Sequence, residues 1–240
     1  MTPSSFTQSY EVPHDRIGLR KVLVVHQAIT RAFELIRKEG FVLGSALEND
    51  ITIKLLNVLN NKVLNRGEVD GFDRTFFGKA RRVEVVNFNG TKKAKKPDIC
   101  FDLQRENQVT WDQEQDALFA ECKPVDKKHL LKNHYCAVGK DCTGIERFVI
   151  GDYAWSMEEG IMIGYVRDGF TIHPDLADAQ GNQSKRMKLG DPSLLVEIRI
   201  TDRDPAGVPL YRSTHKRLFL WNNGSTATPI DLYHSWHDCV

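Results

Sequence analysis

The stretches that decide the fold are KKPDICFD (residues 95–102) and ALFAECKPVDKK (residues 117–128). Both contain an apolar run typical of a strand, yet the second run carries Glu121 and Lys123 two positions apart. Side chains alternate along a strand, so these two project from one face and Cys122 projects from the other. A charge buried in a strand is costly unless it has a partner. The pattern therefore predicts that Glu121 and Lys123 belong to a site.

A hairpin between the two strands would bring a second carboxylate to this site. The polar stretch 105–115 joins them, so the simplest topology is an antiparallel hairpin. If the strands pair about the middle of that loop, Asp98 lies opposite or close to Glu121. Two carboxylates at such a distance repel each other, and a hard divalent cation between them removes the repulsion. We therefore expect Mg²⁺, or Mn²⁺ in its place, at Asp98 and Glu121.

A metal held by few carboxylates suggests the chemistry of the site. Such an ion keeps positions open for water and for phosphate oxygens. It polarises a phosphoryl group and lowers the pKa of a bound water. The ammonium of Lys123 would then orient the attacking water or neutralise charge that develops on the phosphate. These residues predict attack of a water molecule on a phosphate group.

With PD at 97–98, ECK at 121–123 in the next strand and a helix expected after it, the chain resembles the PD-(D/E)xK nuclease superfamily. That family has the restriction-endonuclease-like fold, so the resemblance implies a mixed central β-sheet flanked by helices. It also implies Mg²⁺-dependent cleavage of nucleic acid. In that interpretation Asp98 and Glu121 are metal ligands, and Lys123 is the catalytic lysine.

The resemblance covers about residues 45–166 and implies two further metal contacts. One is the backbone carbonyl of Cys122, which follows the acidic position of the motif. The other is a glutamate on the helix before the first strand, for which Glu48 is the positional match and Glu34 a weaker one. Glu48 also has a structural explanation, because with Ser45 it fits a capping box. Both interpretations of Glu48 stay open.

The order of expected elements predicts one α/β (α+β) domain over residues 1–240. Its parts are an N-terminal helix at 19–39, a nuclease-like core at about 45–166 and a β-rich C-terminal extension at 190–240. Apolar spacing predicts the second helix at 46–64 with Ser45 as its N-cap. The remaining expected elements are strands at 81–88, 97–104, 117–125 and 161–166, helices at 126–139 and 144–160, a polar connection at 177–193, and strands at 194–200, 211–221 and 228–236.

Composition sets the protein class. The chain has 240 residues, 41% of them hydrophobic and 27% charged, as in an ordinary globular protein. No apolar run approaches the roughly eighteen residues of a membrane span, and the N-terminus has no secretory pattern. The five cysteines are scattered and odd in number, which favours reduced thiols. We expect a cytoplasmic protein with no membrane partner.

Local clusters of basic residues predict a nucleic-acid partner, DNA rather than RNA. The net charge is only +1, so any such signal must be local. Basic residues nevertheless flank both halves of the motif, where they could contact phosphates. A solvated face is the alternative for any single lysine. The flanking residues are Lys79, Arg81, Arg82, Lys92, Lys93, Lys95 and Lys96 before Asp98, and Lys127, Lys128, Lys132 and His134 after Lys123.

Two other chemistries are weaker. Zinc could bind two sets of residues, but neither has the paired spacing of a zinc motif. A nucleophile at Cys122 is disfavoured because that thiol faces away from Glu121 and Lys123. The two zinc sets are His129, His134, Cys136 and Cys142, and His234, His237 and Cys239.

The sequence therefore predicts a Mg²⁺-dependent nuclease. A restriction or defence role, with a second copy or an activating protein as partner, follows from analogy of fold alone. The alternative is an inactive nuclease-fold protein that binds nucleic acid, serves as a scaffold or forms an oligomer through its β-rich part.

Overall fold

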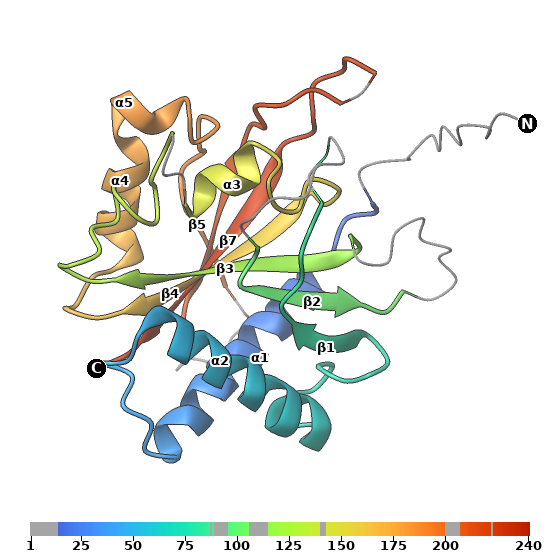
Figure 1. The fold of residues 1–240 in the computed structure, drawn as a ribbon, viewed down its shortest axis with the longest axis vertical. Coiled ribbons are helices and arrows are strands. Elements are labelled where there is room, and N and C mark those ends of the chain that lie inside the picture. The colour runs from blue at the N-terminus through green and yellow to red at the C-terminus, as the bar shows by residue number, and fades with distance from the viewer. Residues whose placement is uncertain are drawn as a thin grey trace, which may run out of the picture.

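The computed structural model describes residues 14–86, 88, 96–105, 115–139, 143–199, 207–221 and 223–240. These residues form a mixed seven-stranded sheet in the order β1-β2-β3-β4-β7-β6-β5. In Figure 1, α1 and α2 lie on one side of the sheet, and α3, α4 and α5 lie on the other. The structure confirms the predicted α/β class with a mixed sheet flanked by helices.

The centre of the sheet is parallel and its two sides are antiparallel. Strands β3 and β4 are buried at every position, as expected for parallel strands covered on both faces. Strands β1, β2 and β3 form an antiparallel meander, β3, β4 and β7 run parallel, and β6 and β5 are antiparallel additions. The bounds are β1 Phe77–Arg81, β2 Ile99–Leu103, β3 Ala117–Val125, β4 Glu159–Val166, β5 Val196–Ile198, β6 Leu210–His215 and β7 Ile230–Asp238.

The first two helices confirm the apolar spacing of the sequence. Helix α1 (Leu19–Lys38) buries one stripe of side chains, and Gly40 ends it in a left-handed conformation with φ of 74°. Helix α2 (Glu48–Val58) continues into a π-helical segment, η1 (Leu59–Leu64). The predicted N-cap at Ser45 is wrong, because Leu47 occupies the N-cap position and no side chain caps that end.

Two predicted elements differ in extent. The strand expected at 81–88 lies at Phe77–Arg81 instead, because β1 pairs with β2 only as far as Arg81 opposite Cys100. The helix expected at 144–160 is the short α3 (Ile145–Val149), and the end of that range belongs to β4. It ends because the backbone turns at Gly151, whose φ is +77°.

Two further predictions are wrong in type. Residues 126–139 form turns rather than a helix, and the carbonyls of His134 and Tyr135 accept hydrogen bonds from Thr143 Oγ1 and the Ile145 amide instead of from amides of a helix. The expected polar connection at 177–193 contains helices, and its residue Gln180 donates to Ser213 on β6 at 3.4 Å. The additional helical segments are η2 Ile172–Leu176, α4 Ala177–Gly181 and α5 Gln183–Arg186.

The β-rich C-terminal part, expected as an extension, supplies β5, β6 and β7 to the same sheet. Strand β7 lies between β4 and β6 and is buried from Ile230 to His237. It pairs in parallel with β4, from Glu159 opposite Asp231 to Val166 opposite Asp238. Four of its buried residues are polar, and each has a hydrogen-bond or ion-pair partner: Asp231, His234, Ser235 and His237.

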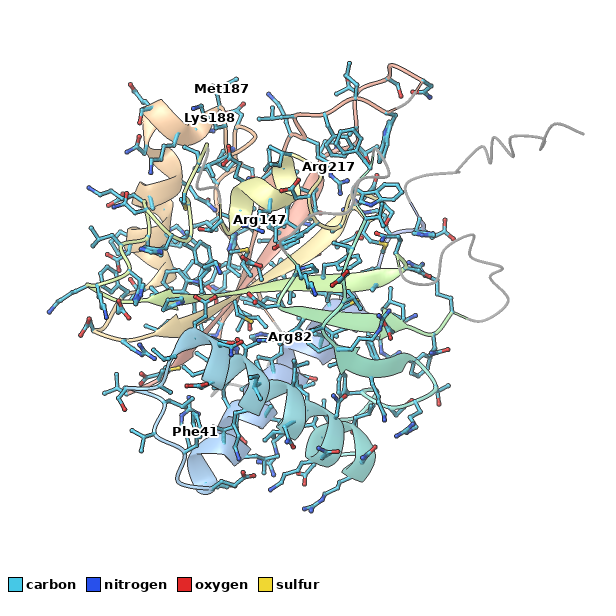
Figure 2. All side chains as sticks on the ribbon, viewed as in Figure 1. Phe41, Arg82, Arg147, Met187, Lys188 and Arg217 are labelled. Atoms are coloured by element: carbon cyan, nitrogen blue, oxygen red, sulfur yellow. The ribbon has the colours of Figure 1, made fainter. Side chains whose placement is uncertain are left out.

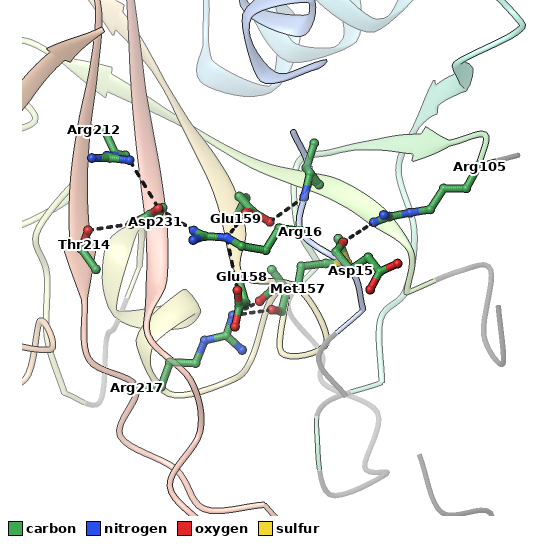
Figure 3. Close-up of polar contacts among 12 residues, drawn as sticks. Asp15, Arg16, Arg105, Met157, Glu158, Glu159, Arg212, Thr214, Arg217 and Asp231 are labelled. Carbon is green, nitrogen blue, oxygen red and sulfur yellow. Dashed lines mark hydrogen bonds and ion pairs between the residues drawn. The ribbon is translucent and has the colours of Figure 1, made fainter. Parts of the chain in front are cut away.

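Ion pairs fix the amino ends of β4 and β7 (Figure 3). Arg16, just before α1, lies 2.8 Å from Glu159 and 2.6 Å from Asp231. Nearby, the buried Arg217 donates to the carbonyls of Trp155, at 2.5 Å, and Met157. Burial lowers the pKa of Arg217 to about 9. These contacts anchor the segment before α1 and the loop before β4, at the end of the strands opposite to their carboxyl ends.

Buried histidines form hydrogen-bonded chains on the sheet. Ser213 Oγ lies 2.8 Å from both His215 Nε2 and His234 Nε2. His215 Nδ1 in turn lies 2.6 Å from the carbonyl of Leu189. Burial lowers the pKa of His215 to about 4 and that of His234 well below its usual value. These rings are therefore neutral in the folded protein near neutral pH.

The first prediction concerns stability in acid. The unfolded chain takes up a proton at His215 below about 6.5, whereas the folded chain resists it down to about 4. The stabilising contribution is therefore complete above about 6.5 and is lost as the pH falls to about 4, amounting to about 3 kcal/mol. Urea unfolding across this range should show the loss.

The matched control is His215→Gln, which keeps a polar side chain but cannot titrate. Its free energy of unfolding should fall less steeply over the same pH range than that of the parent protein. Equal slopes for the two proteins would show that His215 is not the cause.

Candidate active site

The site lies where β2 begins and β3 continues past it. Ile99 pairs with Ala120, so Asp98, the residue before β2, comes level with Glu121. One oxygen of Asp98, Oδ2, accepts a hydrogen bond from the Cys122 amide at 2.8 Å. The predicted antiparallel hairpin is confirmed, and it brings Asp98 to Glu121.

The ammonium of Lys123 is the centre of the site. Its Nζ lies 3.0 Å from Glu48 Oε1, 3.0 Å from Glu121 Oε1 and 4.0 Å from Asp98 Oδ2. It also donates to the backbone carbonyl of Cys122 at 2.9 Å. Its side chain is only 10% exposed. The five residues that sequence analysis assigned to metal binding and catalysis therefore lie together.

Burial and charge determine the protonation of this cluster. Burial raises the pKa of Glu121 to about 7, Lys123 opposes the shift, and Asp98 adds to it. Burial lowers the pKa of Lys123, but the charges of Glu121, Glu48 and Asp98 raise it further, so the net shift is upward. The lysine is thus charged over the whole physiological range.

Glu48 is a member of the site rather than a helix cap. It is the first residue of α2, and its carboxylate accepts from Lys123 Nζ. The capping box with Ser45 is wrong, since Leu47 is the N-cap residue and no side chain caps this end. Glu34, the weaker candidate, lies on α1 and pairs with Arg31 at 2.6 Å. Of the two glutamates, only Glu48 contacts the lysine.

The oxygen atoms of the site fit Mg²⁺ in their chemistry. Carboxylates and a carbonyl are the hard donors that this ion prefers. Buried Glu121 Oε2 has no hydrogen-bond partner among the described residues, so it is available as a ligand. Within the same residues no group of three His, Cys, Asp or Glu side chains is arranged around a metal position. In this arrangement the Lys123 ammonium occupies the space among the carboxylates.

Two residues that the sequence does not single out, a tyrosine and an arginine, contact the segment just before Asp98. Arg147 is part of α3 and lies on the side of that helix that faces the sheet (Figure 2), and its Nη1 donates to the hydroxyl of Tyr153 at 2.6 Å. That hydroxyl donates to the Lys96 carbonyl, two residues before Asp98, at 2.8 Å. The charge of Arg147 also lowers the pKa of Glu121. The only signal in the sequence is an arginine inside an apolar run, IERFV at 145–149.

The basic flanks are described only in part. Lys92, Lys93 and Lys95 lie outside the described residues. Lys96 pairs with Glu84, which reduces its availability for phosphate. On the other flank the exposed lysines follow β3 directly: Lys127, Lys128 and Lys132.

His134 lies on the same turn segment as those lysines and is half-buried. Burial lowers its pKa, and the charges of His129 and Lys123 lower it further. Its ring centroid lies 5.0 Å from that of His129. The structure therefore places an imidazole within electrostatic range of the lysine.

The alternative chemistries have little support in the described residues. His234 and His237 are three positions apart on β7, so they face opposite sides of the sheet and do not converge. Of the first zinc set, Cys142 lies outside the described residues and Cys136 is fully buried. Burial also raises the pKa of the Cys122 thiol well above its usual value, which disfavours a nucleophilic thiolate.

Comparison of the chain with protein-family models, curated proteins and solved structures found no match. The resemblance to the PD-(D/E)xK superfamily therefore rests on the motif residues alone. Among the helices that the described residues form, none has both the length and the apolar composition needed to cross a membrane.

The second prediction tests the donor set. Asp98→Asn and Glu121→Gln should each weaken Mn²⁺ binding by at least about tenfold, because each removes one of few anionic ligands. Isothermal titration calorimetry measures the affinity. Glu34→Gln is the matched control and should bind as the parent protein does. Equal Mn²⁺ affinity in all three variants would show that Asp98 and Glu121 do not bind the metal.

Proposed function

We propose that this protein is a Mg²⁺-dependent nuclease that hydrolyses phosphodiester bonds, in DNA rather than RNA. The observation that supports it is the position of the Lys123 ammonium, 3.0 Å from Glu48 and Glu121 and 4.0 Å from Asp98. The three carboxylates supply anionic ligands for a metal, and the buried lysine among them supplies a fixed positive charge. The PD-(D/E)xK motif, which these residues resemble, also combines carboxylates with one lysine.

Each residue has a distinct role in the proposed reaction. Mg²⁺ held by Asp98, Glu121 and the Cys122 carbonyl would polarise the phosphoryl group and lower the pKa of a bound water. Lys123 keeps its proton and stabilises the charge that develops on the phosphate oxygens. Glu48 holds the lysine side chain in position through its 3.0 Å contact. Tight positioning of this kind is a large part of catalysis by such sites.

The substrate proposal depends on the surface beside the site. Lys127 and Lys128 are exposed directly after β3, so their charges are available to phosphates on one flank. His134 lies near Lys123 on the same segment. A cytoplasmic location and a restriction or defence role, with a second copy or an activating protein, are the setting that we propose for this activity.

One observation favours a second candidate, a nuclease-fold protein that binds nucleic acid without cleaving it. Lys123 already neutralises part of the carboxylate charge without any metal. A purely structural ion-pair cluster would look similar in this respect. Incubation of supercoiled plasmid with Mg²⁺ or Mn²⁺, with and without EDTA, separates the two functions. Metal-dependent nicking supports the nuclease, and intact plasmid supports the binding protein.

The third prediction separates catalysis from binding at Lys123. Lys123→Met keeps most of the side-chain volume and removes the charge. Cleavage should fall by at least about a hundredfold, because the charge acts in the transition state, while DNA affinity stays within about threefold. Single-turnover cleavage and fluorescence anisotropy measure the two effects. A well-folded Lys123→Met protein with full cleavage would exclude the catalytic lysine.

The fourth prediction concerns the exposed lysines after β3. Replacing Lys127 and Lys128 with Gln should reduce the salt dependence of DNA binding, by about 0.9 in log–log slope for each lost phosphate contact. Anisotropy titrations at several salt concentrations give the slope. The control replaces Lys38 and Lys188, which are also exposed, and its slope should be unchanged. An equal slope in both double variants would mean that the first pair does not contact phosphate.

A further inference from the structure

A pocket of about 600 Å³ opens at the carboxyl ends of β4 and β7. Its volume falls within the roughly 300–1,000 Å³ of sites for small molecules. Four of its lining residues carry aromatic rings, and the rings of His173 and Tyr211 meet edge to face with centroids 5.5 Å apart. The residues that characterise the pocket are Phe170, His173, Tyr211, Trp236 and Asp238.

The pocket lies on the same face of the sheet as the candidate active site. Lys123 is in register with Gly164, and Gly164 with Trp236, so the three positions form one row across β3, β4 and β7. Residues in one row project from one face. Two strand spacings of about 4.8 Å place the backbone of Trp236 about 10 Å from that of Lys123.

Gly164 leaves the space between the two sites open to the indole. A Cβ at this position would lie 2.5 Å from Trp236 Cδ1, so any larger residue would displace the ring. The indole Nε1 donates to the hydroxyl of Tyr135 at 3.1 Å. Tyr135 follows His134, which lies within electrostatic range of Lys123. One turn segment therefore lies within electrostatic range of the lysine and contacts the wall of the pocket.

The walls of the pocket select a planar, uncharged ligand. Aromatic side chains stack on the faces of nucleobases. No Lys or Arg is among the described residues that line the pocket, and Asp238 supplies a negative charge, so a phosphate group is disfavoured. A carboxylate accepts hydrogen bonds, and the exocyclic amino groups of cytosine, adenine and guanine donate them. Thymine has no such group.

We propose that this pocket binds an unstacked nucleobase of a single DNA strand whose phosphodiester bond lies at the Lys123 site. This inference rests on the proposed nuclease function. The separation of about 10 Å between the two backbones is short enough for one DNA strand to reach both sites. The bound base therefore belongs to a nucleotide near the bond that is cleaved.

The fifth prediction tests the pocket with Tyr211→Leu, which removes the ring and keeps an apolar side chain. Affinity for a short oligo(dC), measured by fluorescence anisotropy, should fall about tenfold, because stacking on an aromatic ring is lost. Trp221→Leu, another half-buried aromatic residue outside the pocket, is the matched control and should bind as the parent does. Oligo(dC) should bind more tightly than oligo(dT), and Asp238→Asn should reduce that preference.

The outcomes distinguish this inference from the proposed function. Hydrolysis of bis(p-nitrophenyl) phosphate, which has no nucleobase, should be unchanged in Tyr211→Leu. If the parent hydrolyses that ester while Tyr211→Leu binds oligo(dC) normally, the pocket proposal is overturned and the nuclease stands. If no ester or DNA is cleaved but Tyr211→Leu weakens oligo(dC) binding, base binding stands and the nuclease proposal falls.

Discussion

The ion pairs of Lys123 are the interaction on which the rest of the site depends. Strand β3 is buried at all of its positions, so an ammonium there needs counter-charges to remain in place. Glu48 from α2, Asp98 from the start of β2 and Glu121 from β3 itself supply them. The contact therefore connects three elements that are distant in the sequence, and it fixes how α2 and β2 meet β3.

The parallel centre of the sheet separates two kinds of local structure. At the amino ends of β4 and β7, the carboxylates of Glu159 and Asp231 are occupied by Arg16. At the carboxyl ends, the aromatic pocket is open. Ligands commonly bind outside the carboxyl ends of strands in α/β sheets, because loops there are free to vary. The arrangement leaves one end of the strands for stability and the other for binding.

The role of a residue could be predicted where local sequence pattern determines its position. It could not be predicted where it depends on contacts with segments distant in the sequence. The hairpin register placed Asp98 beside Glu121, because alternation and loop length determine it. Glu48 remained ambiguous in the sequence, since its contact with Lys123 joins positions 75 residues apart. Arg147 shows no role in the sequence, because it reaches the site through Tyr153, whose hydroxyl contacts the Lys96 carbonyl on a distant segment. The sequence predicts a helix at 126–139, whereas the turns found there depend on contacts of Tyr135 with His234 and Trp236 on β7, which no local pattern shows.

The charges of Glu48, Asp98, Glu121 and Lys123 show how this cluster could exist both without a metal and with the proposed one. Three carboxylates and one ammonium carry a formal charge of −2 when all are ionised. Without a divalent cation, burial raises the pKa of Glu121 to about 7, so a proton partly compensates that charge near neutral pH. A divalent cation would compensate it fully and favour the ionised form of Glu121. A simple structural ion pair would be most stable with equal numbers of opposite charges. The excess of negative charge around a lysine that stays protonated is therefore what supports the proposed metal site over a simple salt bridge.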